Sequence, residues 1–367
     1  MIIFRYLSKE IMVALSATIL ILLIIFITNQ FVHYLNDAAN GKITVQAVME
    51  VMSLQIPLLL GYLLPLSFFL GTLLTLGRFY VDHEMVVLSA SGVSQAWFVS
   101  VVMCLAMVMM ALVASLMLWV EPKMQWYQGK ILTRAVTMAS LEKVLPGRFQ
   151  SLGEDNSVFY AARAGEHHQW MEDVLFATRT VTQKGRESWD LVVADFASEM
   201  TTPSGSRFIV FKRGARYVGI PGALNYQVTH FDEYGIRLKV PTSDVSRRIE
   251  AMPTSRLWSL HDTNVRAASE LQWRLAMPLS VFVLGLLAVP LSYANPRKGK
   301  FARLLPAILI YIVYVDFLFV GRAWIEKGKM HPAWGLWWVH GAVFLLALLL
   351  LLYQQRERLY GIFFKRK

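Results

Sequence analysis

The chain has 367 residues, of which 56% are hydrophobic and 17% are charged, and its formal net charge is +11. A soluble globular protein is about 45–50% apolar and about 25% charged, so this composition argues against an ordinary soluble protein. The apolar residues come in long blocks, as in a chain that has lipid as its solvent. In such a chain a positive net charge more often reports basic cytoplasmic loops than nucleic-acid binding.

Six apolar runs come close to the ~20 residues that cross a bilayer. Three precede residue 121 and three follow residue 272; they are residues 11–31, 51–76, 96–120, 275–294, 304–320 and 333–353. The first run is too long for the apolar core of a cleaved signal peptide, and no small-x-small cleavage site follows it at the right place. The sequence therefore predicts an α-helical membrane protein with six transmembrane helices, three within residues 1–120 and three within 271–367.

The distribution of Lys and Arg predicts that both termini are cytoplasmic. The short loops on the opposite side carry only Lys42, Arg322, Lys327 and Lys329. The side of the termini carries Arg5, Lys9, Arg78, Arg297, Lys298, Lys300, Arg303, Arg356, Arg358, Lys365, Arg366 and Lys367. Because cytoplasmic loops are enriched in basic residues, residues 121–270 are expected to face outward, into the periplasm or an equivalent space.

The outward segment has the pattern of an all-β domain. Runs rich in Val, Phe, Tyr, Ile and Thr alternate with turn-forming stretches; the runs are residues 157–164, 173–182, 189–200, 207–218 and 226–240. We expect the longer runs to break into two strands each, which gives roughly eight strands in a sandwich, jelly roll or open barrel. The expected inward residues could form a packed core or line an open groove; they are Phe159, Val174, Phe176, Val193, Phe208 and Val210.

The sequence contains no constellation that indicates an enzyme. It has no GxxxxGK[ST] phosphate loop and no GxSxG elbow. His83-Glu84 begins like a zinc-protease motif, but Val87 stands where the second His is needed. His167 and His168 are adjacent without further ligands, so we expect no metal and no cofactor in this chain. If the protein does work, a partner supplies the energy.

A short cytoplasmic helix is predicted over residues 81–92, between the second and third spans. Val81, Met85 and Leu88 form one apolar stripe, and Glu84 lies inside it. A carboxylate on a docking face is costly unless the partner offers a cation or hydrogen-bond donors. We therefore favour a partner-docking helix; the alternative is a solvated or headgroup-facing helix in which Glu84 is merely exposed.

Asp316 lies in the fifth span, twelve residues past Leu304, which is about 18 Å along a helix. An ionised Asp at the middle of a membrane costs roughly 2.5–3.5 kcal/mol. We expect it to face a wet cavity, to pair with a cation from another helix, or to be protonated. A functional role and a structural polar contact both remain open for this residue.

Several blocks resemble the YjgP/YjgQ permease family, the paralogous membrane subunits F and G of the lipopolysaccharide-export ABC transporter. The blocks are PLSFFLG at 65–71, running on through LGRFY at 76–80 to Glu84, ELQWR at 270–274 and PLSYANPR at 290–297. The match covers the whole chain in motif order and architecture. The start MIIFRYL and the turn at 295–297 are closer to the F-type subunit, and the G-type subunit is the alternative.

The resemblance implies a transport mechanism. An F-type and a G-type (LptG-like) subunit would enclose a cavity open to the outer leaflet of the bacterial inner membrane. A dimer of an LptB-like ATPase, which binds ATP and Mg²⁺, would drive lipopolysaccharide from that cavity into periplasmic β-jellyroll domains, including that of a single-span LptC-like protein. Helix 81–92 would be the coupling helix, with Glu84 as its acidic residue. The rival hypotheses are an envelope sensor or scaffold and a lipid-modifying membrane enzyme.

The resemblance also implies that the first and fifth spans line the gates of the cavity. Their outer ends carry Gln30, His33 and Arg322. Family members often have a more basic end to the first span, so Gln30 and His33 depart from the pattern. Arg322 is the better candidate for a substrate phosphate, although its side chain could equally reach the membrane interface by itself.

Overall fold

The computed structural model describes residues 2–39, 43–142, 146–151, 157–165, 170–181, 187–201, 207–220, 222–223, 226–237, 248–293 and 304–364. The chain divides into two compact units. The membrane unit comprises Met1–Phe31, Met52–Gly129 and Asp244–Lys367. The β unit comprises Val32–Val51 and Lys130–Ser243.

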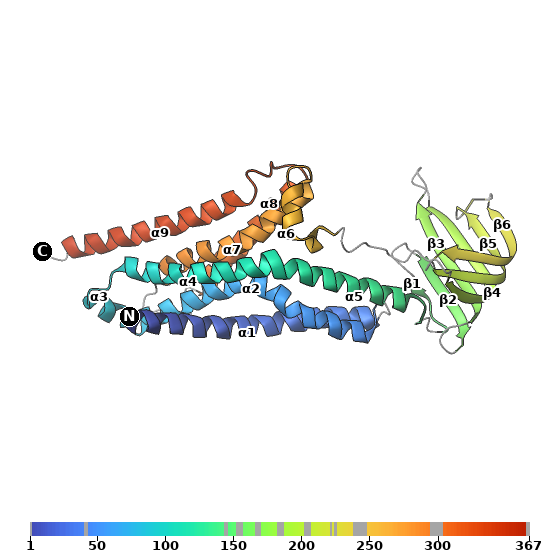
Figure 1. The fold of residues 1–367 in the computed structure, drawn as a ribbon, viewed down its shortest axis with the longest axis horizontal. Helices are drawn as coiled ribbons and strands as arrows, with labels where there is room; N and C mark the ends of the chain where they lie inside the picture. The colour runs from blue at the N-terminus through green and yellow to red at the C-terminus, as the bar shows by residue number, and fades with distance from the viewer. Residues whose placement is uncertain are drawn as a thin grey trace. The chain divides into compact units, whose positions relative to one another are not determined.

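Six helices in the described part of the chain are long and apolar enough to cross a membrane, which confirms the six predicted spans (Figure 1). The helices that contain them are α1 (Ile2–Ala39), α2 (Val45–Val81), α4 (Gln95–Ser115), α7 (Val265–Leu291), α8 (Leu304–Glu326) and α9 (Trp337–Phe364). The short helices are α3 (Glu84–Ala90), η4 (Ile249–Ala251) and α6 (Thr254–Leu260).

The third span does not end where its apolar run ends. A π-helical turn, η1 (Leu116–Val120), joins α4 to α5 (Glu121–Glu142), so the helix continues into residues that the sequence analysis assigned to the β domain. The prediction placed the boundary at residue 121 because the apolar run stops there. Helix formation depends on backbone hydrogen bonds and propensity rather than on hydropathy, so a helix can outlast its apolar run.

In the membrane unit, α7 is the most buried helix and packs against α4, α8 and α9. Its apolar side chains join one core cluster with Phe68 and Phe69 of α2 and Val102 of α4. The backbones of α1 and α2 approach closely at Gly71, where an added Cβ would lie 2.8 Å from the backbone nitrogen of Leu15. Small residues at such crossings are typical of membrane helices, which associate by close packing.

Arg274 of α7 is fully buried and holds residues 249–254, which follow the β unit in the chain, against α7. Its guanidinium donates to the Glu270 carboxylate at 2.9 Å and to the carbonyl oxygens of Glu250 and Met252, each at 2.9 Å. A further bond reaches the Thr254 hydroxyl at 3.1 Å. A buried charge is tolerated when it is paired and hydrogen-bonded, and Arg274 meets both conditions.

The same segment also contacts the π-helical turn. The Thr254 hydroxyl donates to the carbonyl oxygen of Leu118 at 2.6 Å. A π turn replaces the i→i+4 backbone hydrogen bonds of the α-helix with i→i+5 bonds, and such turns are frequent at functional sites. Within the membrane unit, the last turns before the β unit and the first residues after it are therefore joined through Thr254 and Arg274.

The described strands form one antiparallel sheet in the order β1-β2-β3-β4-β5-β6, so each strand pairs with its sequence neighbours. They are β1 (Gln150–Ser151), β2 (Ser157–Ala164), β3 (Met171–Val181), β4 (Glu187–Thr201), β5 (Arg207–Gly219) and β6 (Gln227–Arg237). An inserted all-β domain is confirmed. The expectation that the longer runs break into two strands is wrong, because each of them is a single strand in the sheet.

A crease crosses the sheet where the paired ladder skips one residue on each of strands β2 to β6. The skipped residues lie opposite one another; they are Ala162, Asp173, Asp195, Arg213 and Asp232. Asp173 and Arg213 have positive φ values of 50° and 54°, which are uncommon for residues with a side chain. A row of such residues is expected to bend the sheet in the way that a bulge bends a strand.

The crease shifts the alternation of inward residues by one. Core residues on either side of it are three apart, as with Ala194 and Ala197 on β4 and Phe231 and Tyr234 on β6. Side chains from the two sides of the crease meet: the Arg216 guanidinium lies 5.3 Å from the centre of the Tyr234 ring. The bent sheet therefore encloses its own core between its two halves.

Part of the predicted inward set is corrected by this crease. Phe159 and Val174 are fully buried in the core, and Phe176 packs against it, as predicted. Val193 is 42% exposed because its neighbours Val192 and Ala194 face the core. On β5 the inward residues are Ile209 and Phe211 in place of Phe208 and Val210. A strict period of two fails when the crease changes the alternation within a strand.

Arg274→Gln should strongly destabilise the membrane unit, because it leaves the Glu270 carboxylate and the carbonyls of residues 249–252 without their cation. Breaking a buried pair costs about 3–5 kcal/mol. Thermal unfolding of the purified chain in detergent measures the loss. Arg266→Gln is the control, since Arg266 is an exposed arginine on the same helix. Equal unfolding temperatures for the two variants would show that Arg274 does not stabilise the packing of residues 249–254.

Candidate functional site

Helix α3 follows directly on α2 and begins at Glu84. The residue before it, His83, has a left-handed backbone with φ 61° and makes no capping side-chain bond. The helix has 7 residues, so it is shorter than the predicted range of 81–92. A helix of this length depends on its contacts with the rest of the protein for its stability.

The apolar stripe that was predicted to dock a partner is used inside this chain. Met85 is 5% exposed, and Leu88 packs against the same core cluster as Phe79. The outer surface of α3 carries Val86 and Val87, which are 62% and 64% exposed. The stripe is inward because a short helix must first pack on its own protein. The apolar surface available to a partner is therefore the pair Val86 and Val87.

Glu84 lies at the first turn of α3 and contacts α1. One of its carboxylate oxygens, Oε2, accepts a hydrogen bond from the Tyr6 hydroxyl at 3.2 Å. One turn further along α1, Glu10 pairs with Arg78 of α2 at 2.9 Å. Tyr6 could not be predicted from the sequence, because nothing in the spacing of the two segments shows that α1 begins beside α3.

Arg322 at the end of α8 is already paired within the chain. Its guanidinium contacts Glu270 at 2.8 Å and Glu326 at 3.0 Å and lies 5.0 Å from the centre of the Trp273 ring. Its side chain is 22% exposed. Glu270 thus accepts from Arg322 of α8 as well as from Arg274 of its own helix, which links α7 to α8. A substrate phosphate at Arg322 would have to compete with two carboxylates.

Asp316 lies on the exposed face of α8. The buried face of that helix carries Tyr314 and Leu318, while Val313 and Phe317 beside Asp316 are 52% and 47% exposed. The carboxylate is therefore directed away from the chain's own core, toward whatever surrounds this helix.

The two predicted gate residues on α1, Gln30 and His33, differ in their exposure. Gln30 is partly buried. His33 is exposed, and its ring nitrogen lies 3.8 Å from the carboxylate of Asp37, one turn away. A neutral or acid-paired histidine is a weak ligand for an anion, in line with the departure from the family pattern noted above.

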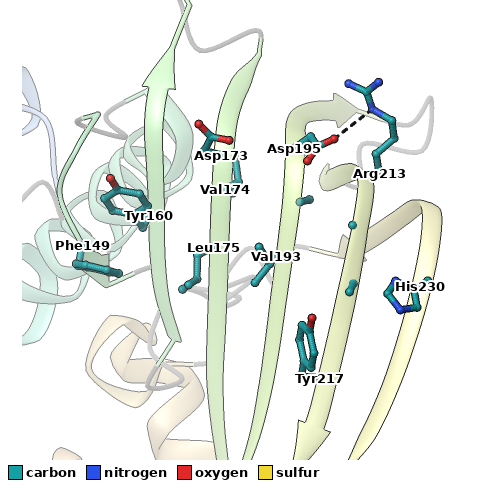
Figure 2. A pocket seen from close by; sticks show the side chains of 13 residues that line it. Phe149, Tyr160, Asp173, Val174, Leu175, Val193, Asp195, Arg213, Tyr217 and His230 are labelled. Atoms are coloured by element: carbon teal, nitrogen blue, oxygen red, sulfur yellow. Dashed lines mark ion pairs between the residues drawn. The ribbon is translucent and has the colours of Figure 1, made fainter.

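The β unit carries a pocket of about 590 Å³ on the face opposite its core (Figure 2). Apolar side chains such as Leu175 and Val193 form its wall, and Figure 2 shows Asp173 and the ion-paired Asp195 and Arg213 beside them. The Arg213–Asp195 distance is 3.4 Å. The charged residues belong to the crease, so the pocket lies along it.

One ion pair on the core-facing side of the sheet joins strands β4 and β5. Arg216 of β5 donates two hydrogen bonds to Asp190 of β4, at 2.9 and 2.6 Å. Hydrogen bonding to Asp190 raises the pKa of Arg216. Arginine is already protonated at every physiological pH, so the guanidinium of Arg216 links the two strands as a permanent cation.

No group of three or more His, Cys, Asp or Glu side chains that could hold a metal occurs among the described residues. His167 and His168, and the motif residues Asn295 to Arg297, lie outside the described residues. The structure therefore adds no test of the histidine pair.

Comparisons with known proteins agree with this architecture. The family model for the lipopolysaccharide export system permease LptF/LptG matches residues 5–353. The chain is 30% identical over 351 residues to the lipopolysaccharide export system permease protein LptF of Escherichia coli K12, which covers 95% of this chain and 94% of that protein. The proteins of the same name from Escherichia coli O157:H7 and Shigella flexneri match with the same identity and coverage. The chain belongs to the LptF/LptG family of lipopolysaccharide export permeases.

Proposed function

We propose that this chain is the F-type permease subunit of an ABC transporter that extracts lipopolysaccharide from the inner membrane and passes it to a β-jellyroll bridge toward the outer membrane. The observation that carries the proposal is α3, a short helix between two membrane-spanning helices. It presents Val86 and Val87 outward with Glu84 at its first turn. Family membership supports a permease subunit of either type, and the relatives named LptF support the choice of the F-type over the G-type subunit.

The chain has no phosphate-binding loop, so its work requires an ATPase partner. We propose that an LptB-like ATPase dimer, loaded with ATP and Mg²⁺, binds α3 on the cytoplasmic side. Val86 and Val87 supply apolar area, and Glu84 pairs with a cation or donor of the ATPase. The excess of Lys and Arg on the side of the termini supports this orientation, in which the β unit would lie in the periplasm.

The remaining partners follow from the membrane and β units. An LptG-like subunit completes a cavity for lipopolysaccharide, and Asp316 faces that cavity or a cation on the neighbouring subunit. The β unit passes the acyl chains on, together with the jellyroll domain of an LptC-like protein. In this structure its inner face is filled by residues such as Phe159 and Phe211, each 0% exposed. Loading of acyl chains there therefore requires the two halves of the bent sheet to separate.

Glu84→Ala should weaken binding of the ATPase about 10- to 100-fold, the effect of removing one charge-assisted hydrogen bond at an interface. Titration of the purified ATPase onto the detergent-solubilised permease pair measures the affinity. Asp262→Ala is the control, because Asp262 is an exposed carboxylate placed on the outward side by the same charge distribution. Unchanged affinity for Glu84→Ala would remove Glu84 from the docking surface.

Asp316→Leu should reduce lipopolysaccharide export about tenfold, because an exposed carboxylate at mid-membrane is retained only where it meets water or a cation. Export is measured as lipopolysaccharide transferred from proteoliposomes to a soluble acceptor. Asp316→Asn separates charge from shape and should behave like Asp316→Leu, and Phe317→Leu is the control on the same face. Normal export with Asp316→Leu would leave this residue without a functional role.

A further inference from the structure

The contact between Tyr6 and Glu84 joins two elements that are 78 residues apart in the sequence. The Tyr6 ring stacks on Phe79, with centroids 5.5 Å apart and planes inclined by 13°. Phe79 is 0% exposed, as are Leu7 and Ile11, which anchor this end of α1 in the core. The Tyr6 ring, 41% exposed, therefore rests on a buried neighbour at an anchored end of α1.

By contrast, α3 has few anchors of its own. Met85 is its only buried side chain, and its N-terminus has no side-chain cap. Glu84 stands at that uncapped end, directly after the left-handed residue His83. The Tyr6 hydroxyl is thus the contact that ties the carboxylate to the rest of the membrane unit.

The hydrogen bond leaves Glu84 usable by a partner. Tyr6 donates to Oε2, and no hydrogen bond to the second oxygen, Oε1, occurs among the described residues. A carboxylate can accept several hydrogen bonds at once. One oxygen is therefore held from inside the chain, while the other remains available to a cation.

We propose that Tyr6 is a positioning residue that orients Glu84 for the ATPase and joins α1 to α3. This inference rests on the proposed function. Holding a flexible side chain in its bound orientation before binding reduces the conformational entropy that is lost on binding. When the ATPase moves α3, the same bond carries the displacement to α1, and the Glu10–Arg78 ion pair ties α1 to α2 next to it.

The test compares four versions of the full chain in complex with its paralogous subunit: wild type, Tyr6→Phe, Glu84→Ala and the double variant. Tyr6→Phe keeps the ring on Phe79 and removes only the hydroxyl. Each complex is titrated with the purified ATPase in detergent. We expect Tyr6→Phe to weaken binding about two- to tenfold in the wild-type background. It should have no further effect in the Glu84→Ala background, because Tyr6 acts through Glu84.

Tyr293→Phe is the matched control. Tyr293 also packs its ring on a neighbour, with centroids 5.3 Å from Tyr80, and its hydroxyl makes no hydrogen bond among the described residues. This variant should bind the ATPase like the wild type. If Tyr6→Phe weakened binding only through general damage to the structure, the double variant would bind the ATPase more weakly than Glu84→Ala alone.

The outcomes separate this inference from the proposed function. If Glu84→Ala weakens binding and Tyr6→Phe does not, the positioning role is wrong and the docking surface stands. If Tyr6→Phe tightens binding, the hydroxyl competes with the ATPase for Glu84, and the positioning role is again wrong. If neither variant changes the affinity, the docking assignment of Glu84 itself fails.

Discussion

Among the described residues of the membrane unit, one fully buried cation, Arg274, holds the surrounding segments together. Arg274 is completely enclosed, and a guanidinium in that position is stable only because Glu270 and several backbone carbonyls surround it. Those carbonyls belong to the segment that returns from the β unit, so the charge that α7 buries also fixes where that segment lies. Glu270 in turn holds Arg322, which brings α8 into the same network.

The Arg274 network and α3 differ in how firmly they are held in the membrane unit. The Arg274 network is buried and cross-linked by several charge-assisted bonds, whereas α3 is short, uncapped and anchored by Met85 and the Tyr6 hydroxyl. Elements that move in a working cycle come from the less stable parts of a protein. The second arrangement suits the docking role that we propose for α3, and the first suits a segment that leads into the β unit.

The sequence was sufficient for the features that depend on hydropathy and turn chemistry. The six spans follow from long apolar runs, and strand β2 matches its predicted range of 157–164.

Features that depend on tertiary contacts could not be predicted from hydropathy and turn chemistry. Alternation could not reveal a crease that shifts inward residues by one, so Val193 was assigned to the wrong face. The stripe through Met85 identified an amphipathic helix, but it could not say whether the stripe packs on the chain or on a partner. For Arg322, the i,i+4 spacing could have indicated Glu326 on the same helix, but only the fold brings in Glu270, which is 52 residues away in the sequence.

The most direct test of the proposed function is native mass spectrometry of this chain, purified from its own membranes in mild detergent. We predict a complex that contains a dimeric P-loop ATPase and a second six-span subunit of the same family, and that loses the ATPase first when the carboxylate of Glu84 is removed. A chain that purifies alone, or with a kinase or a scaffold protein in place of the ATPase, would contradict the transporter assignment and favour an envelope sensor.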